Sequence, residues 1–188
     1  MSSIYETTDR PKEYNSSKLE SLLPIGKDES KLICYLQSSL NNEIEAGNTY
    51  APKFPFNLSE FKNYFLVGDV FIIINSGKNL SIDFSNNLEN AILGTFYIKP
   101  NFPGRYSHIC NGGFITSNIY RNQGIGRIMA LAFIKITPLL CYKASMFNLV
   151  FSNNTSSIRL WRSLGFQEIG RILNAGYLIK KKKKRQNK

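Results

Sequence analysis

Two motifs, each joined to a helical segment, constrain this chain more than any other feature of its sequence. The first is Arg121-Asn-Gln-Gly-Ile-Gly126, which leads into an apolar segment with helical periodicity. The second begins at Asn154, a residue type that caps helices, and ends at Leu164-Gly165-Phe166. A glycine turn at a helix start leaves several backbone N–H groups unpaired, and such donors bind phosphate. The sequence therefore predicts a helix whose first turn is open to an anionic ligand.

The composition predicts one globular domain. The chain has 188 residues, of which 43% are hydrophobic and 13% aromatic, enough for one core but short for two ordinary domains. No apolar stretch approaches the ~18–20 residues that span a bilayer, and the polar N-terminus lacks a signal-peptide pattern. We therefore expect no membrane partner and a cytoplasmic or nuclear location.

Metal and disulfide chemistry are not indicated. The three cysteines have no metal-ligand spacing, and the chain has one histidine. We expect three reduced thiols and no metal site.

The net charge of +11 is concentrated at the C-terminus. Residues 180–188 hold seven basic and no acidic residues, and without them 17 of the 24 basic residues remain against 13 acidic ones. The run Lys180–Arg185 is typical of a nuclear-import signal, of a weak tether to nucleic acid or anionic lipid, or of a solvated tail without a role. Sequence-specific DNA recognition is not indicated.

The order of apolar segments predicts a mixed α/β fold. We expect a loose arm over residues 1–28, one folded domain over 29–179 and the basic tail over 180–188. Helices are predicted at 30–46, at a short segment capped by Asn57 or Ser59, after Gly126 as far as Pro138, and at 155–164. Strands are predicted at 70–75, 91–98, 108–116, 145–151, 166–172 and 176–180, with a polar loop at 77–89.

With both motifs in this order, the chain resembles the GNAT superfamily of acetyl-CoA-dependent N-acetyltransferases over residues 30–180. Arg121-x-x-Gly124-x-Gly126 is similar to its pyrophosphate loop, and Asn154 to Phe166 is similar to its second conserved helix. The resemblance implies a single domain whose central, mostly antiparallel twisted sheet is splayed at the acetyl-CoA site and flanked by helices.

Three further segments narrow the resemblance to the fungal L-azetidine-2-carboxylate (proline-analogue) N-acetyltransferases. They are residues 41–50, 97–114 and 147–151. This subgroup implies a small imino or amino acid substrate, a role in detoxification and a homodimer. It also shares its domain with a fungal chromatin regulator of histone genes, so small-molecule and protein substrates both remain open.

The resemblance assigns roles to particular residues. It implies that the substrate is bound, and the reaction catalysed, by Asn111 and Asn148, with Phe114 beside the substrate. A backbone N–H near residues 114–116 would polarise the acetyl carbonyl. The residues implied in acetyl-CoA binding are Phe114, Ile115, Thr116, Arg121, Asn122, Gln123, Gly124, Ile125, Gly126, Arg127, Asn154 and Ser157.

The acid and base of the reaction are not evident from the sequence. Many superfamily members have a tyrosine acid where this chain has Trp161, whose indole N–H has no useful acidity. His108 has a suitable pKa as a residue type, but a structural or surface role is the favoured interpretation. An acetylated Cys110 is disfavoured because no partner pattern accompanies it. A nuclear histone acetyltransferase and a non-catalytic acetyl-CoA-binding module remain as alternatives.

Aromatic residues are dense between residues 50 and 64. We expect some of them to line the acceptor pocket and most of them to belong to the core. They are Tyr50, Phe54, Phe56, Phe61 and Tyr64.

Overall fold

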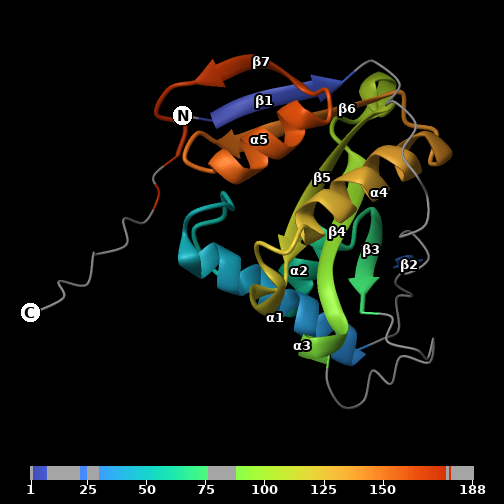
Figure 1. The fold of residues 1–188 in the computed structure, drawn as a ribbon, viewed down its shortest axis with the longest axis vertical. Helices are drawn as coiled ribbons and strands as arrows, with labels where there is room; N and C mark the ends of the chain where they lie inside the picture. The colour runs from blue at the N-terminus through green and yellow to red at the C-terminus, as the bar shows by residue number, and fades with distance from the viewer. Residues whose placement is uncertain (1, 8–21, 25–29, 76–87, 177, 179–188) are drawn as a thin grey trace, which may run out of the picture.

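The computed structural model describes residues 2–7, 22–24, 30–75, 88–176 and 178, and shows one sheet with helices on both of its faces (Figure 1). The seven strands lie in the order β2-β3-β4-β5-β6-β1-β7. None of the helices within these ranges is long and apolar enough to cross a membrane. The mixed α/β architecture predicted from the sequence is therefore confirmed.

The helices and strands follow the predicted segments closely. The helices are α1 (Ser30–Ala46), α2 (Leu58–Phe65), α3 (Leu88–Ala91), α4 (Ile125–Leu139) and α5 (Thr155–Ser163), with 3-10 turns at Gly104–Tyr106 and Asn118–Tyr120. The strands are β1 (Ser2–Thr7), β2 (Leu22–Pro24), β3 (Asp69–Ile74), β4 (Ile92–Pro100), β5 (Ile109–Thr116), β6 (Ala144–Phe151) and β7 (Gln167–Ile172).

The short helix α2 is capped by Asn57 rather than Ser59. The Asn57 side chain accepts a hydrogen bond from the Glu60 N–H at 2.9 Å, and the Glu60 carboxylate accepts one from the Asn57 N–H at 2.8 Å. This reciprocal capping box pairs two N–H groups that the helix itself leaves unpaired. The cap starts α2 directly after residues 51–56, which are in neither a helix nor a strand.

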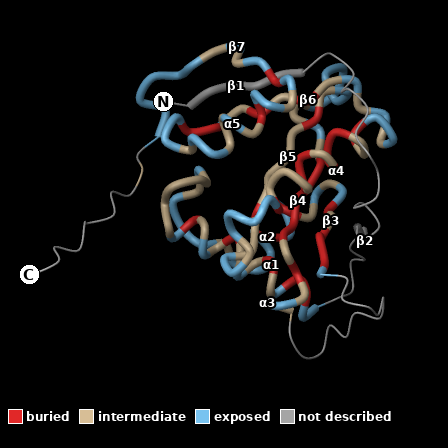
Figure 2. The backbone as a smooth tube through the Cα atoms, viewed as in Figure 1, coloured by how far each residue is buried: buried red, intermediate tan, exposed pale blue. Residues whose placement is uncertain are grey.

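Alternation along the strands produces a core on each face of the sheet. In β3, Ile72 and Ile74 pack with α1 and α2, whereas Ile73 packs in the cluster formed with α4. In β4, Tyr97 lies with the first cluster and Phe96 with the second, as expected when successive side chains point to opposite faces. Figure 2 shows the buried residues along β3, β4 and α4. Two covered faces hold the central strands in a fixed frame.

The sheet is split between its two central parallel strands. Strands β5 and β6 are paired at two positions, Ile109 with Ala144 and Cys110 with Ser145. Every other ladder that the structure describes is antiparallel, including that of β4 with β5, which runs over seven residue pairs from Gly94–Thr116 to Pro100–Cys110. Beyond Cys110 and Ser145 the two strands separate, and the predicted splay of a mostly antiparallel sheet is confirmed.

The N-terminal segment corrects one prediction. Instead of a wholly loose arm, residues 2–7 form β1, which lies between β6 and β7 and pairs antiparallel with both. Residues 22–24 form β2 at the edge of β3. The physical reason is tertiary: the backbone donors and acceptors that order these two short strands come from segments distant in the sequence.

Several other predictions fall where the structure gives no description. The predicted loop at 77–89 lies outside the described residues except for its last two positions, which belong to α3. The basic tail also lies outside them. Of the strand predicted at 176–180, Gly176 and Leu178 are described, and neither is in a strand.

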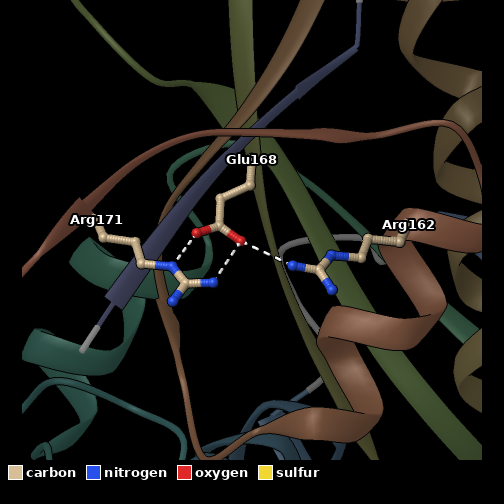
Figure 3. Close-up of polar contacts among 3 residues, drawn as sticks. All are labelled: Arg162, Glu168 and Arg171. Carbon is tan, nitrogen blue, oxygen red and sulfur yellow. Dashed lines mark hydrogen bonds and ion pairs between the residues drawn. The ribbon is translucent and has the colours of Figure 1, made fainter.

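A charged cluster joins α5 to β7 on the far side of the split (Figure 3). The Glu168 carboxylate accepts hydrogen bonds from the Arg162 guanidinium at 3.0 Å and from Arg171. These hydrogen bonds lower the pKa of Glu168 to about 2, and the hydrogen bond from Arg171 makes the largest contribution to this shift. Arg162 lies on α5 and Arg171 on β7, so the cluster connects the two elements at the side of the sheet nearest α5.

Candidate active site

The first turn of α4 is open in the way the glycine motif predicts. Gly124 has a φ of +83°, a left-handed conformation that disfavours any residue with a Cβ, and no side chain caps the helix. The N–H groups of Arg127 and Ile128 donate to the Gly124 carbonyl, which leaves those of Ile125 and Gly126 for an outside acceptor. An added Cβ on Gly126 would have Leu160 Cδ2 at 3.9 Å as its nearest neighbour. The space above this turn can hold a diphosphate.

A cavity of about 590 Å³ occupies the split between β5 and β6 and extends to this turn. Every site residue predicted from the sequence lines it except Gln123, whose side chain donates to the Ile119 carbonyl at 3.1 Å. The predicted residues that line it are Asn111, Phe114, Ile115, Thr116, Arg121, Asn122, Gly124, Ile125, Gly126, Arg127, Asn148, Asn154 and Ser157. Two motifs far apart in the sequence therefore meet at one cavity.

The second motif contributes the other end of the cavity wall. Asn154 caps α5 by accepting a hydrogen bond from the Ser157 N–H at 3.3 Å. Ser156, Ser157 and Leu160 from this helix line the cavity. The first turns of α4 and α5 thus both border the cavity, which places two helix N-termini, each with partial positive charge, beside any anionic ligand.

Arg121 is held by a residue that the sequence reasoning did not single out. Its guanidinium pairs with the Glu43 carboxylate of α1, and Thr49 Oγ1 donates to the other carboxylate oxygen of Glu43 at 3.2 Å. The Arg121 side chain is 47% exposed and that of Glu43 14%. Arg121 therefore stands at the open rim of the cavity, within reach of a ligand at the α4 turn.

The two predicted amides are brought together at the point where the strands separate. Asn111 lies on β5 one residue after its last pairing with β6, and Asn148 lies on β6. A third amide, Asn101, connects them: it exchanges two hydrogen bonds with Asn148, at 2.8 and 2.6 Å, and accepts one from Asn111 at 3.2 Å. The sequence reasoning missed Asn101, because its place depends on the pairing of β4 with β5.

Neutral aromatic side chains cover the cavity beside these amides. Tyr50, Tyr64 and Tyr97 line it, and burial raises the pKa of all three phenols, so each is uncharged at neutral pH. The Tyr50 hydroxyl lies 3.5 Å from the Phe114 carbonyl. A Cβ on Gly113 would come within 2.5 Å of the Tyr97 ring, which shows that the glycine permits this close approach. Tyr97 is, after Glu43 and Asn101, a third site residue that the sequence reasoning did not identify.

The other three aromatic residues of this region divide between core and surface, whereas most of the five were expected in the core. Phe61 is fully buried in the core with α1. Phe56 packs partly buried against the same cluster, and Phe54 is 69% exposed. The cavity therefore takes two of the five aromatics that were considered, Tyr50 and Tyr64.

Lys99 lies directly behind the tyrosines. Its ammonium donates to the Tyr64 carbonyl at 2.9 Å and stands 4.6 and 4.7 Å from the ring centroids of Tyr64 and Tyr97. Burial lowers the pKa of Lys99, and its ammonium is close enough to both rings for cation–π contacts. Lys99 orders the aromatic wall without lining the cavity.

Three residues considered as catalytic groups are placed by the structure in other roles. Trp161 is buried in an aromatic cluster, with its ring centroid 4.3 Å from that of Phe147, and forms part of the cavity wall. Cys110 lies 3.0 Å from Ser145 Oγ, and burial raises its pKa to about 11, so it is a thiol rather than a nucleophilic thiolate. His108 is exposed, with Nδ1 3.1 Å from the Arg105 carbonyl.

A metal centre has no set of ligands in the ranges that the structure describes, where no group of three or more His, Cys, Asp and Glu side chains could hold an ion. The polar groups that converge on the cavity are instead amides, hydroxyls and helix N-termini. These groups bind anions and polar neutral ligands.

Comparison with known proteins agrees with this geometry. A family model described as the Acetyltransferase (GNAT) family matches residues 50–166. N-acetyltransferase aca1 of Schizosaccharomyces pombe is 40% identical over 157 residues, which cover 81% of this chain and 75% of that protein.

Solved structures show the same fold. A GCN5-related N-acetyltransferase from Kribbella flavida matches with a TM-score of 0.68 at 21% identity, over 85% of this chain and 94% of that one. A phosphinothricin acetyltransferase from Sinorhizobium meliloti, solved in complex with acetyl-CoA, matches with a TM-score of 0.65 at 14% identity, over 85% and 84%.

Proposed function

This chain belongs to the acetyltransferase (GNAT) family, and we propose that it acetylates the nitrogen of a small imino or amino acid such as L-azetidine-2-carboxylate. Family membership makes it an acetyl-CoA-dependent N-acetyltransferase. The observation that carries the choice of acceptor is the pair of amides, Asn111 and Asn148, at the fork of the split sheet. Neutral amides beside neutral tyrosines suit a small polar acceptor better than an extended basic peptide.

The open turn of α4 fits the diphosphate of acetyl-CoA. The N–H groups of residues 125–126 and the Arg121 guanidinium would hold it, and the first turn of α5 would hold the neighbouring part of the ligand. Bound acetyl-CoA supplies an activated acetyl thioester. The separated edges of β5 and β6 leave room for its acetyl end. Backbone N–H groups near residues 114–116 would polarise the carbonyl, a contribution of ~3–4 kcal/mol per donor.

The acceptor would lie against the amides, with Phe114 beside it. Asn148 and Asn111 can each donate and accept a hydrogen bond without introducing charge, which matches a group with both a carboxylate and a reacting nitrogen. Attack is direct within a ternary complex, because the Cys110 thiol, with its raised pKa of about 11, is a poor candidate for an acetylated intermediate.

Proton movement relies on water in this proposal. Glu43 is the carboxylate among the residues that line the cavity, and it is engaged by Arg121 and Thr49. The tyrosines are held neutral by burial, and Trp161 cannot protonate a thiolate. Water ordered by Asn148 would accept the proton of the attacking nitrogen, and solvent would protonate the departing thiolate.

A protein-lysine acceptor has less support. A groove for a basic histone tail would need several carboxylates, whereas Glu43 is the one carboxylate that lines the described cavity. A non-catalytic binding module is disfavoured because both amides line the cavity with the acetyl-CoA motifs. A homodimer, a role in detoxification, a cytoplasmic or nuclear location and contact of the Lys180–Arg185 tail with nucleic acid remain part of this proposal.

Release of free CoA thiol from acetyl-CoA tests the proposal. L-Azetidine-2-carboxylate, L-proline and a histone-tail peptide are offered separately to the wild type, to Asn148→Ala and to Asn153→Ala, an exposed neighbour outside the cavity. We expect turnover with an imino acid, a loss of about 100-fold in Asn148→Ala and no change in Asn153→Ala. Turnover with the peptide alone would move the acceptor to the protein class, and tight CoA binding without any turnover would favour a binding module.

A further inference from the structure

Three asparagine amides form one connected hydrogen-bonded chain at the fork of the sheet, and the middle amide does not reach the cavity. Asn101 follows β4, and its backbone N–H donates to the Ile109 carbonyl at 2.8 Å, which fixes it beside the start of β5. Asn111 and Asn148 line the cavity, whereas Asn101 does not. Asn101 therefore lies behind the two amides that would meet the acceptor.

The orientation of all three amides is set by one backbone donor. The Gly112 N–H donates to Asn111 Oδ1 at 2.8 Å, and because an N–H can only donate, the oxygen of Asn111 must face it. Asn111 Nδ2 then faces Asn101 Oδ1 at 3.2 Å. With its oxygen so placed, Asn101 presents Nδ2 to Asn148 Oδ1 at 2.8 Å and accepts from Asn148 Nδ2 at 2.6 Å.

We propose that Asn101 is a positioning residue, which holds the amides of Asn148 and Asn111 in the orientation that the acceptor requires. This inference rests on the proposed acceptor role of those two residues. The reciprocal pair with Asn101 uses one N–H and one lone pair of Asn148 and leaves one of each for a ligand. Without Asn101, Asn148 can rotate about its terminal side-chain bond, and the donor and acceptor that it presents can exchange places.

Kinetics of four variants test this role with the full chain. Asn101→Ala removes the partner, Asn101→Asp keeps the size but replaces the Nδ2 donor by an oxygen, Asn148→Ala removes the positioned amide, and Asn63→Ala is a matched control on the exposed side of α2. We expect Asn101→Ala and Asn101→Asp to lower kcat/KM for the imino acid by about 10- to 100-fold, with KM for acetyl-CoA unchanged. Asn63→Ala should match the wild type.

Two readouts separate positioning from packing. In the double variant Asn101→Ala/Asn148→Ala, we expect a loss well below the product of the two single losses, because Asn101 acts mainly through Asn148 and only the part that it exerts through Asn111 remains. The activity of Asn101→Asp relative to wild type should rise as the pH falls from 6 towards 4, the range in which a carboxyl with a pKa of about 3.9 becomes protonated and regains an O–H donor. The proposal would be overturned if the loss of kcat/KM in the double variant equalled the product of the two single losses. Full activity of Asn101→Asp would also overturn it.

A spectroscopic measurement covers the case in which the imino acid is not the acceptor. Side-chain amide NMR signals of Asn111 and Asn148 should shift in Asn101→Ala and stay in place in Asn63→Ala, whatever the acceptor. An inactive wild type with these shifts would refute the proposed acceptor and leave the positioning role. Unshifted signals would refute the positioning role, even in an active enzyme.

Discussion

Among single residues, the role of Gly124 in binding acetyl-CoA can be tested by comparison with Gly165, a glycine with a similar left-handed backbone conformation. Gly124 and Gly165 have φ of +83° and +89°, and an added Cβ at either would meet no atom within 4 Å. Alanine at either position should cost about 1–2 kcal/mol of stability for the left-handed backbone. Only Gly124 borders the cavity, so Gly124→Ala alone should raise KM for acetyl-CoA, by several-fold, in steady-state assays with matched unfolding curves. Equal effects of both variants on KM would argue against a diphosphate at the α4 turn.

Among the helices and strands, the charged cluster that connects α5 to β7 predicts that the stability of the fold depends on pH. The pKa of Glu168 falls from 4.5 to about 2 on folding, so its contribution to stability is complete above about pH 4.5 and is lost as the pH falls towards 2. Arg162 and Arg171 are 55% and 51% exposed, which limits that contribution to about 1 kcal/mol. Urea unfolding should show Glu168→Gln less stable by this amount at pH 7 and equal to wild type near pH 2. The exposed Glu45→Gln is the control, and a pH-independent difference for Glu168→Gln would show that the carboxylate charge is not involved.

The elements also show what local sequence can and cannot predict. Helices α1, α4 and α5 follow from apolar periodicity and from caps within each segment, and the glycine turn and Asn154 mark their own places at the cavity. Strand β1 does not follow, because its partners lie about 140 to 170 residues away along the chain, at positions such as Val150 and Arg171. Asn101 and Glu43 were missed for the same reason: the first depends on the β4–β5 pairing and the second on how α1 docks.

At the scale of the whole molecule, the N-terminal strand joins the C-terminal strand to the rest of the sheet. In the described sheet β7 pairs with β1, and β1 in turn pairs with β6, the strand that carries Asn148. Ser3 is opposite Val150 on one side and Arg171 on the other, so proline there would interrupt a strand with neighbours on both sides. We expect Ser3→Pro to lower Tm by about 5–10 °C and to weaken acceptor turnover through β6, whereas Ser3→Ala, which keeps the backbone N–H, should melt close to wild type. Equal melting of the two variants would mean that β6 and β7 hold together without β1, and the end of the chain would then have no part in supporting the active-site wall.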